Sequence, residues 1–197
     1  MEQLQSLLFW ISSAFLLPAM VAILGLFVYA TYLAGGVLAE TLDRRVNKDS
    51  LRRLYEGEPT LERFLGLDWK LALGRFADGA KLHPERLDKV VIDLENDLRQ
   101  RAERLSVLAR TGPMLGLIGT LIPLQPALAG LAAGDMQSMA SNLLIGFTTT
   151  VVGLIVGGAS FALGVQVRNW GRQDLAEMHY LLEVWSAERS EEGVPDA

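Results

Sequence analysis

The chain has 197 residues, a hydrophobic fraction of 50%, no cysteine and a formal net charge of -5. The lack of cysteine excludes disulfides, thiolate nucleophiles and cysteine-built metal sites, and the acidic balance argues against a nucleic-acid binder, which needs a basic surface. Three uncharged stretches of 37, 24 and 32 residues lie at 3–39, 111–134 and 136–167. Because about 20 apolar residues cross a bilayer, we predict an all-α integral membrane protein with three transmembrane helices.

The first transmembrane helix is predicted within residues 1–39. The opening residues Met1–Gln5 lack the basic region of a cleavable signal peptide, and the apolar stretch from Leu7 to Ala34 is longer than the hydrophobic part of a signal. We therefore expect this span to be retained. A signal cleaved near Val37–Ala39 is the alternative.

The next segment, residues 40–110, is predicted to be a cytoplasmic helical region. It holds fifteen of the eighteen Lys and Arg residues, and the other three lie in 168–197. Since cytoplasmic segments of membrane proteins carry the excess of basic residues, we expect an N-out/C-in orientation with both of these segments inside.

Three helices are expected in this region. Shorter ones at Leu38–Tyr55 and Leu61–Ala77 are separated by the turn signal Glu56–Pro59 and can pack as a small lobe. A longer amphipathic helix runs from Pro84 to Arg110 and continues toward the second span, with a kink expected at Gly112-Pro113. Its apolar face consists of Leu87, Val90, Val91, Leu94, Leu98, Ala102, Leu105 and Leu108.

The second and third transmembrane helices are predicted at 111–134 and 142–167, as an antiparallel hairpin closed by the turn Gly134–Ser141. Residues 168–197 form a cytoplasmic C-terminal helix and tail. The helix, Trp170–Glu188, carries apolar residues at helical spacing and is expected to pack on the lobe, while the polar tail from Ser190 is expected to be disordered.

The interiors of the three spans contain no Asp, Glu, Lys, Arg or His. A membrane protein that relays protons by itself needs such a side chain, because the proton must rest on a titratable group. If ions cross here, the titrating group must come from another polypeptide.

Hydroxyl groups supply most of the polar character of the spans. In a hairpin, Thr120 and Thr150 lie at similar depth, with Thr149 adjacent, and could form a ring of hydroxyls in an oligomer. Alternatively, each threonine bonds only the carbonyl one turn earlier in its own helix, which has no functional meaning. The spacing leaves both possibilities open.

Small residues form a stripe on each of the last two spans. Such stripes let helix backbones approach closely, so these faces should meet protein and not lipid. Ordinary packing between the second and third spans of one chain is the alternative, and it accounts for one stripe more easily than for two. The glycines predicted to make this close contact are Gly116, Gly146, Gly153, Gly157 and Gly164.

The segment Arg110-Thr-Gly-Pro-Met-Leu-Gly-Leu-Ile-Gly-Thr120, followed by Thr149-Thr150-Val-Val-Gly153-Leu154, resembles the MotA/TolQ/ExbB proton-channel family. The likeness covers roughly 105–168, and the topology extends it over the chain as an ExbB/TolQ-like subunit. The chain departs from the family pattern at Pro123, where an aromatic residue is usual, and at Gly157-Gly158, where an Ala-Ile-Pro-like stretch is usual. These departures bear on which branch of the family the chain resembles and which partner it drives, more than on the resemblance to the family itself.

The resemblance implies a homopentamer in the cell inner membrane, surrounding two copies of a single-span partner similar to ExbD, TolR or MotB. In such complexes the partner's membrane Asp carries the ion and the threonines that match Thr120 and Thr150 face it, with Thr149 as a neighbour. The implied function couples a flow of H⁺ or Na⁺ to mechanical work, as in energy transduction for protein transport or uptake. No cofactor, metal site or catalytic residue is expected.

A passive membrane scaffold that acts through its cytoplasmic helical lobe is the alternative function. In that case Thr120 and Thr150 are replaceable, and changes on the Leu87–Leu108 face are the harmful ones. An enzyme is not expected, because His83 and His179 both lie outside the spans and no Ser/His/Asp arrangement is available.

Overall fold

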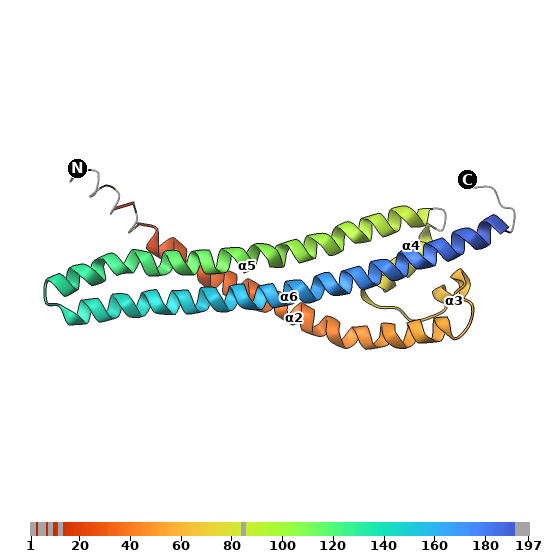
Figure 1. The fold of residues 1–197 in the computed structure, drawn as a ribbon, viewed down its shortest axis with the longest axis horizontal. Helices are drawn as coiled ribbons and strands as arrows, with labels where there is room; N and C mark the ends of the chain where they lie inside the picture. The colour runs from red at the N-terminus through yellow and green to blue at the C-terminus, as the bar shows by residue number, and fades with distance from the viewer. Residues whose placement is uncertain (1–2, 4–6, 8–9, 12–13, 84–85, 192–197) are drawn as a thin grey trace. The chain divides into compact units, whose positions relative to one another are not determined.

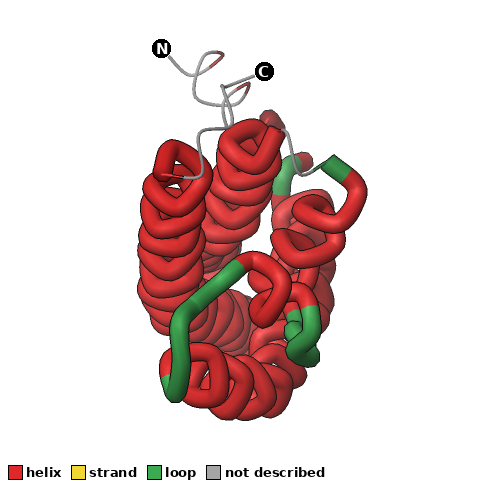
Figure 2. Tube along the Cα trace, turned by 90° about the vertical axis from the view of Figure 1, so that its right-hand side faces the viewer, coloured by secondary structure: helices red, strands yellow, loops and turns green. Residues whose placement is uncertain are grey.

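The computed structural model describes residues 3, 7, 10–11, 14–83 and 86–191, with side chains up to residue 187. Its helices are α2 (Leu16–Tyr55), α3 (Leu61–Leu65), α4 (Leu71–Leu82), α5 (Leu87–Ala132) and α6 (Met136–Glu191) (Figure 1). Across the described ranges there is no strand, as Figure 2 also shows. The prediction of an all-α fold is therefore confirmed.

Three of these helices are long and apolar enough to cross a membrane, namely α2, α5 and the part of α6 up to Ala187. This confirms the prediction of three helices that are able to span a membrane. Large apolar side chains remain exposed along all three, for example Leu24, Leu121 and Phe147, as expected of surfaces that meet lipid or another protein. The predicted first span before Leu16 and the polar tail from residue 192 fall largely or wholly outside the described residues.

Two helices run on beyond the bounds given to them from the sequence. The expected helix Leu38–Tyr55 is the second half of α2, since nothing in the sequence after Ala34 interrupts the helix. Helix α5 likewise continues through Pro113, Pro123 and Pro126 without interruption. A proline removes one backbone hydrogen bond from a helix but does not have to end it within a membrane.

The chain divides into two compact units. The first, called here the apolar bundle, comprises the residues up to Ala34 together with Arg104–Gly164. The second, called here the helical lobe, comprises Gly35–Glu103 together with the chain from Val165 onward. Helices α2, α5 and α6 each contribute one part to either unit, so both units are assembled from distant stretches of sequence.

In the apolar bundle, α5 and α6 run side by side in opposite directions (Figure 1). Their turn is shorter than the expected Gly134–Ser141. Gly134 has a φ of 75°, which favours glycine, and the Asp135 carboxylate accepts a hydrogen bond from the Ser138 amide at 2.9 Å, which caps the start of α6. Ala30 of α2 is buried against Leu108 and Val156, so all three helices meet.

The helical lobe has an aromatic core. Phe64 stacks on Trp69 with ring centroids 4.6 Å apart, and Phe76 lies parallel to Trp185 at 6.1 Å. Met178 and Leu181 of α6 are fully buried in the same core, and the indole of Trp185 donates to the Pro59 carbonyl at 2.7 Å. The prediction that the C-terminal helix packs on a small helical lobe is confirmed.

The expected helix Leu61–Ala77 was wrong: it is split by a loop into α3 and α4. Side chains of α2 bind the loop backbone and replace the hydrogen bonds that a helix would make. Asn47 accepts from the Lys70 amide and donates to the Lys70 carbonyl, both at 2.8 Å, and Ser50 donates to the Asp68 carbonyl at 2.6 Å. Both side chains are buried, so these contacts override local helix propensity.

Candidate functional site

The closest approach of α5 and α6 in the apolar bundle is made by glycines. A methyl group built on Gly153 would lie 2.6 Å from the Gly112 carbonyl oxygen, and one built on Gly157 would lie 2.6 Å from the ring of Pro113. Real side chains essentially never come this near to a neighbour, so only glycine fits at this spacing. Gly116 is slightly less tight, with Gly153 and Thr150 at 3.3 Å.

The other two glycines of the predicted stripe differ from these. A methyl group on Gly146 would make ordinary contacts, at 3.4 Å from Thr120 and 3.5 Å from Pro123. Gly164, at the end of the unit, is buried. Of the five predicted glycines, Gly116, Gly153 and Gly157 therefore make the tightest contacts, and they make them between the second and third spans of one chain.

This close approach places two threonines together. The Thr150 hydroxyl donates to the Gly116 carbonyl on α5 at 2.9 Å, and its oxygen lies 3.3 Å from that of Thr120. Thr120 also lies 2.8 Å from the Leu117 carbonyl of its own helix. Thr150 thus bonds across the helix pair, whereas Thr120 has a local partner as well. Both side chains stay partly exposed in the single chain.

The neighbouring threonines are held differently. Thr149 is 7% exposed, and its hydroxyl donates to the Gly146 carbonyl of its own helix at 2.8 Å. It packs so tightly on Gly119 that a methyl group there would lie 2.5 Å from the Thr149 oxygen. Thr148 bonds the Leu144 carbonyl at 2.8 Å on an exposed face. Of these threonines, Thr150 is the one whose hydroxyl bonds across to α5, at Gly116 and Thr120.

Chemically, this site offers hydroxyl and carbonyl oxygens. They can coordinate a cation but do not titrate near neutral pH. The three apolar segments contain no Asp, Glu, Lys, Arg or His. Over the described residues, no group of three or more His, Asp and Glu side chains is placed to hold a metal ion. The arrangement can therefore line an ion path but cannot by itself hold a proton.

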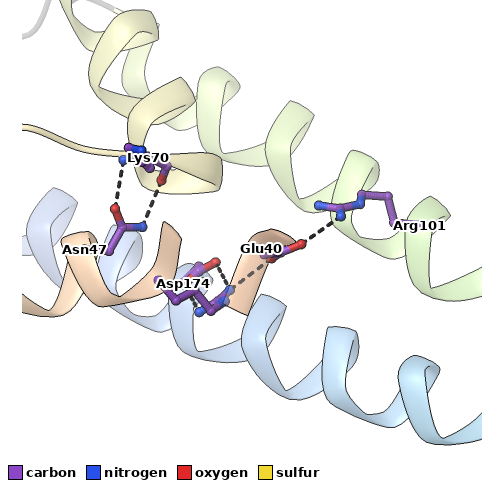
Figure 3. Close-up of polar contacts among 6 residues, drawn as sticks. Glu40, Asn47, Lys70, Arg101 and Asp174 are labelled. Carbon is purple, nitrogen blue, oxygen red and sulfur yellow. Dashed lines mark hydrogen bonds and ion pairs between the residues drawn. The ribbon is translucent and has the colours of Figure 1, made fainter. Parts of the chain in front are cut away.

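Sequence reasoning missed a polar network in the helical lobe. Asp174 accepts two hydrogen bonds from the Arg44 guanidinium, at 2.6 and 3.1 Å. Buried Glu40 accepts from Arg44 at 3.5 Å and from Arg101 at 2.8 Å, so α2, α5 and α6 are joined at one level (Figure 3). The Arg44 guanidinium also lies 4.6 Å from the centre of the Trp170 ring.

Burial is the dominant influence on Asp174. It raises the pKa of this carboxyl group above its ordinary value, and the hydrogen bonds and charge of Arg44 offset the effect only in part. The spacing of Glu40 and Arg44, four residues apart on one helix, could have been noticed in the sequence. The contact between Arg44 and Asp174, 130 residues apart, left no local pattern.

Comparison with known proteins adds one finding. The sequence model of the MotA/TolQ/ExbB proton channel family matches residues 77–178, more than half of the chain. This range includes Thr120, Thr149, Thr150 and the close-packed glycines. No curated protein and no solved structure matches the chain.

Proposed function

The chain belongs to the MotA/TolQ/ExbB proton channel family, and on that basis we propose that it is the ring-forming subunit of an ion-driven motor in the cell inner membrane. The family is one of proton-channel subunits rather than enzymes. The proposal goes further: about five copies enclose the membrane helices of a single-span ExbD, TolR or MotB-like partner, in N-out/C-in orientation.

The observation that carries the proposal is the pairing of Thr120 with Thr150 within a lining that has no titratable group. The two hydroxyls lie 3.3 Å apart at the contact of the second and third apolar helices and are not fully buried in the single chain. A path lined by hydroxyls needs an acid from elsewhere, and a partner helix with a membrane Asp supplies one. Thr149 is the less suitable lining residue, because its hydroxyl is already turned to its own helix.

The transported ion is H⁺ or Na⁺, and its flow drives relative motion of the ring and its partner. Moving one charge down a membrane potential releases about 2.3 kcal/mol per 100 mV, so several ions suffice for a conformational step. Apolar side chains that remain exposed on α2, α5 and α6 supply the surfaces that lipid and neighbouring subunits cover in this proposal.

The proposal is tested first by the composition of the complex. The affinity-tagged chain is purified from its native membrane and weighed by native mass spectrometry. We expect about five copies of this 21.6 kDa subunit with two copies of a smaller single-span protein. An isolated chain that conducts protons as well as the complex does, or an assembly without a central partner, contradicts the proposal.

The second test uses Thr150→Val, which keeps the shape of the side chain but removes the hydroxyl. We expect the complex to assemble and its ion flux in proteoliposomes to fall to near the background. Thr148→Val is the matched control, since Thr148 lies two residues away and bonds only its own helix. Full ion flux in Thr150→Val would favour the alternative, a passive membrane scaffold. Substitutions on the Leu87–Leu108 face of α5 should then be the damaging ones.

A further inference from the structure

The helical lobe contains a pocket of about 600 Å³ that the ion-path proposal does not use. It is lined by α2 and α6 with one residue from α4, and every residue lining it belongs to the lobe. From α2 come Thr41, Arg44, Arg45, Asn47, Lys48 and Leu51, from α4 Leu73, and from α6 Trp170, Gln173, Asp174 and Glu177.

The α2 wall of this pocket offers unpaired positive charge. Arg44 is fixed by Asp174 and is mostly buried. Arg45 and Lys48, in contrast, are exposed and have no ion pair within the described part of the chain. Two cationic groups one helical turn apart therefore remain available to an anion from outside.

The α6 wall cancels this charge only in part. Asp174 is already neutralised by Arg44, at 2.6 Å. Glu177 accepts a hydrogen bond from the Tyr55 hydroxyl at 2.7 Å, and this contact, after burial, raises the pKa of Tyr55. Glu177 keeps its negative charge in this contact, so the lining holds three cations, Arg44, Arg45 and Lys48, against the two carboxylates and is positive by one charge.

Leu51, Leu73 and Trp170 give the pocket an apolar wall beside the polar side chains of Thr41, Asn47 and Gln173. Leu73 is 1% exposed and belongs to the lobe core, Leu51 packs against that core, and the indole of Trp170 is held beneath the Arg44 guanidinium. A pocket with a cationic edge and an apolar wall fits an anion that carries an apolar body better than a small inorganic ion.

The position of the lining along the chain indicates the source of such an anion. Glu40, the first charged residue after a stretch of 37 uncharged ones, directly precedes Thr41. Arg168, the first after a stretch of 32, precedes Trp170 by two residues. In a helix that crosses a bilayer, the first charged residues and interfacial tryptophans lie at the level of the lipid headgroups.

We propose that this pocket binds a phosphate group carried on an apolar body, held by Arg45 and Lys48, and that an anionic phospholipid of the adjacent leaflet supplies it. The phosphate oxygens accept hydrogen bonds from the two cations, and the glycerol and upper acyl segments lie along Trp170 and Leu51. Basic residues next to a membrane span attract anionic lipids through the same forces.

The test measures ligand-dependent thermal stabilisation of the purified full-length complex in a neutral detergent. The probes are short-chain phosphatidylglycerol, short-chain phosphatidylcholine, ATP and inorganic phosphate. We expect phosphatidylglycerol alone to raise the melting temperature in a saturable manner. In the double variant Arg45→Gln/Lys48→Gln its apparent affinity should fall at least about tenfold.

The matched control is Arg52→Gln/Arg53→Gln, which removes the same charge from the same helix outside the pocket lining. It should respond to phosphatidylglycerol like the unmodified protein. Equal weakening in both double variants indicates attraction to a basic surface only and overturns the proposal. An equal response to ATP or phosphate overturns the lipid as source, and no response to any probe overturns the site. The test measures melting temperature and not ion flux. Its outcomes therefore do not depend on whether the proposed function is correct.

Discussion

Gly153 of α6 lies so close to Gly116 of α5 that a methyl group on Gly153 would stand 2.8 Å from the Gly116 Cα. At this distance two helix backbones touch directly, and van der Waals contact replaces the side-chain packing that joins most helices. The hydrogen bond from Thr150 to the Gly116 carbonyl is possible only because the backbones come this near. The glycines and the threonine pair therefore form one structural unit.

Gly153→Ala should separate α5 and α6 and destabilise the protein by about 1 to 3 kcal/mol, since the added methyl group meets backbone that cannot turn away. Gly158→Ala is the matched control, because nothing lies within 4 Å of a methyl group there. It should be neutral or slightly stabilising, as alanine favours a helix over glycine. The measurement is thermal unfolding in detergent, and equal melting temperatures for the two variants would contradict the contact.

Ser160→Ala should have the opposite effect. Ser160 is 0% exposed, and its hydroxyl oxygen finds no hydrogen-bond partner among the described residues. An unsatisfied buried hydroxyl costs about 1 to 3 kcal/mol, so removing it should raise the melting temperature of the purified subunit. A clear loss of stability on this substitution would show that the hydroxyl is bonded in the assembled protein.

Asn47→Ala should destabilise the helical lobe. It removes both hydrogen bonds to the Lys70 backbone and leaves a buried amide and carbonyl unpaired, at a cost of about 1 to 3 kcal/mol. Tryptophan fluorescence during thermal unfolding reports this change, since Trp69, Trp170 and Trp185 all lie in the lobe. Asp49→Ala, at an exposed position on the same helix, should leave the transition within experimental error.

The pH dependence of stability should reveal Asp174. Its folded-state pKa lies above the ordinary value of 3.8, so the folded protein takes up this proton at higher pH than the unfolded chain does. The stabilisation is complete below the unfolded-state pKa and is lost as pH rises through the folded-state pKa. The melting temperature of the protein minus that of Asp174→Asn should therefore increase from neutral pH to about pH 4. A constant or falling difference would contradict the raised pKa.

The spans and the long helices were predictable because their signals are local. Uncharged stretches long enough to cross a bilayer, and apolar residues such as Leu94 and Leu98 at helical spacing, need no knowledge of the fold. The likeness of Thr120 and Thr150 to a family pattern was equally visible. Their roles in an ion path stay predictions.

The parts that sequence reasoning did not predict depend on distant residues. The loop between α3 and α4 forms because Asn47 and Ser50, on another helix, satisfy its backbone, and no local pattern announces such partners. Glu40 and Asp174 were likewise read only as charges outside the spans. Their burial follows from the meeting of three helices, in which Arg101 contacts Glu40 across 61 residues of sequence and Arg44 contacts Asp174 across 130.

The lobe core has a further consequence for the making of the protein. Phe64 and Phe76 are translated early, whereas Met178, Leu181 and Trp185, which close the core over them, come after both later spans. During synthesis, Phe64 and Phe76 therefore lack their packing partners from α6 until residues 178–185 have left the ribosome. Truncated or stalled chains therefore expose hydrophobic surface. Chaperones and proteases can recognise this surface before an incomplete subunit joins an assembly.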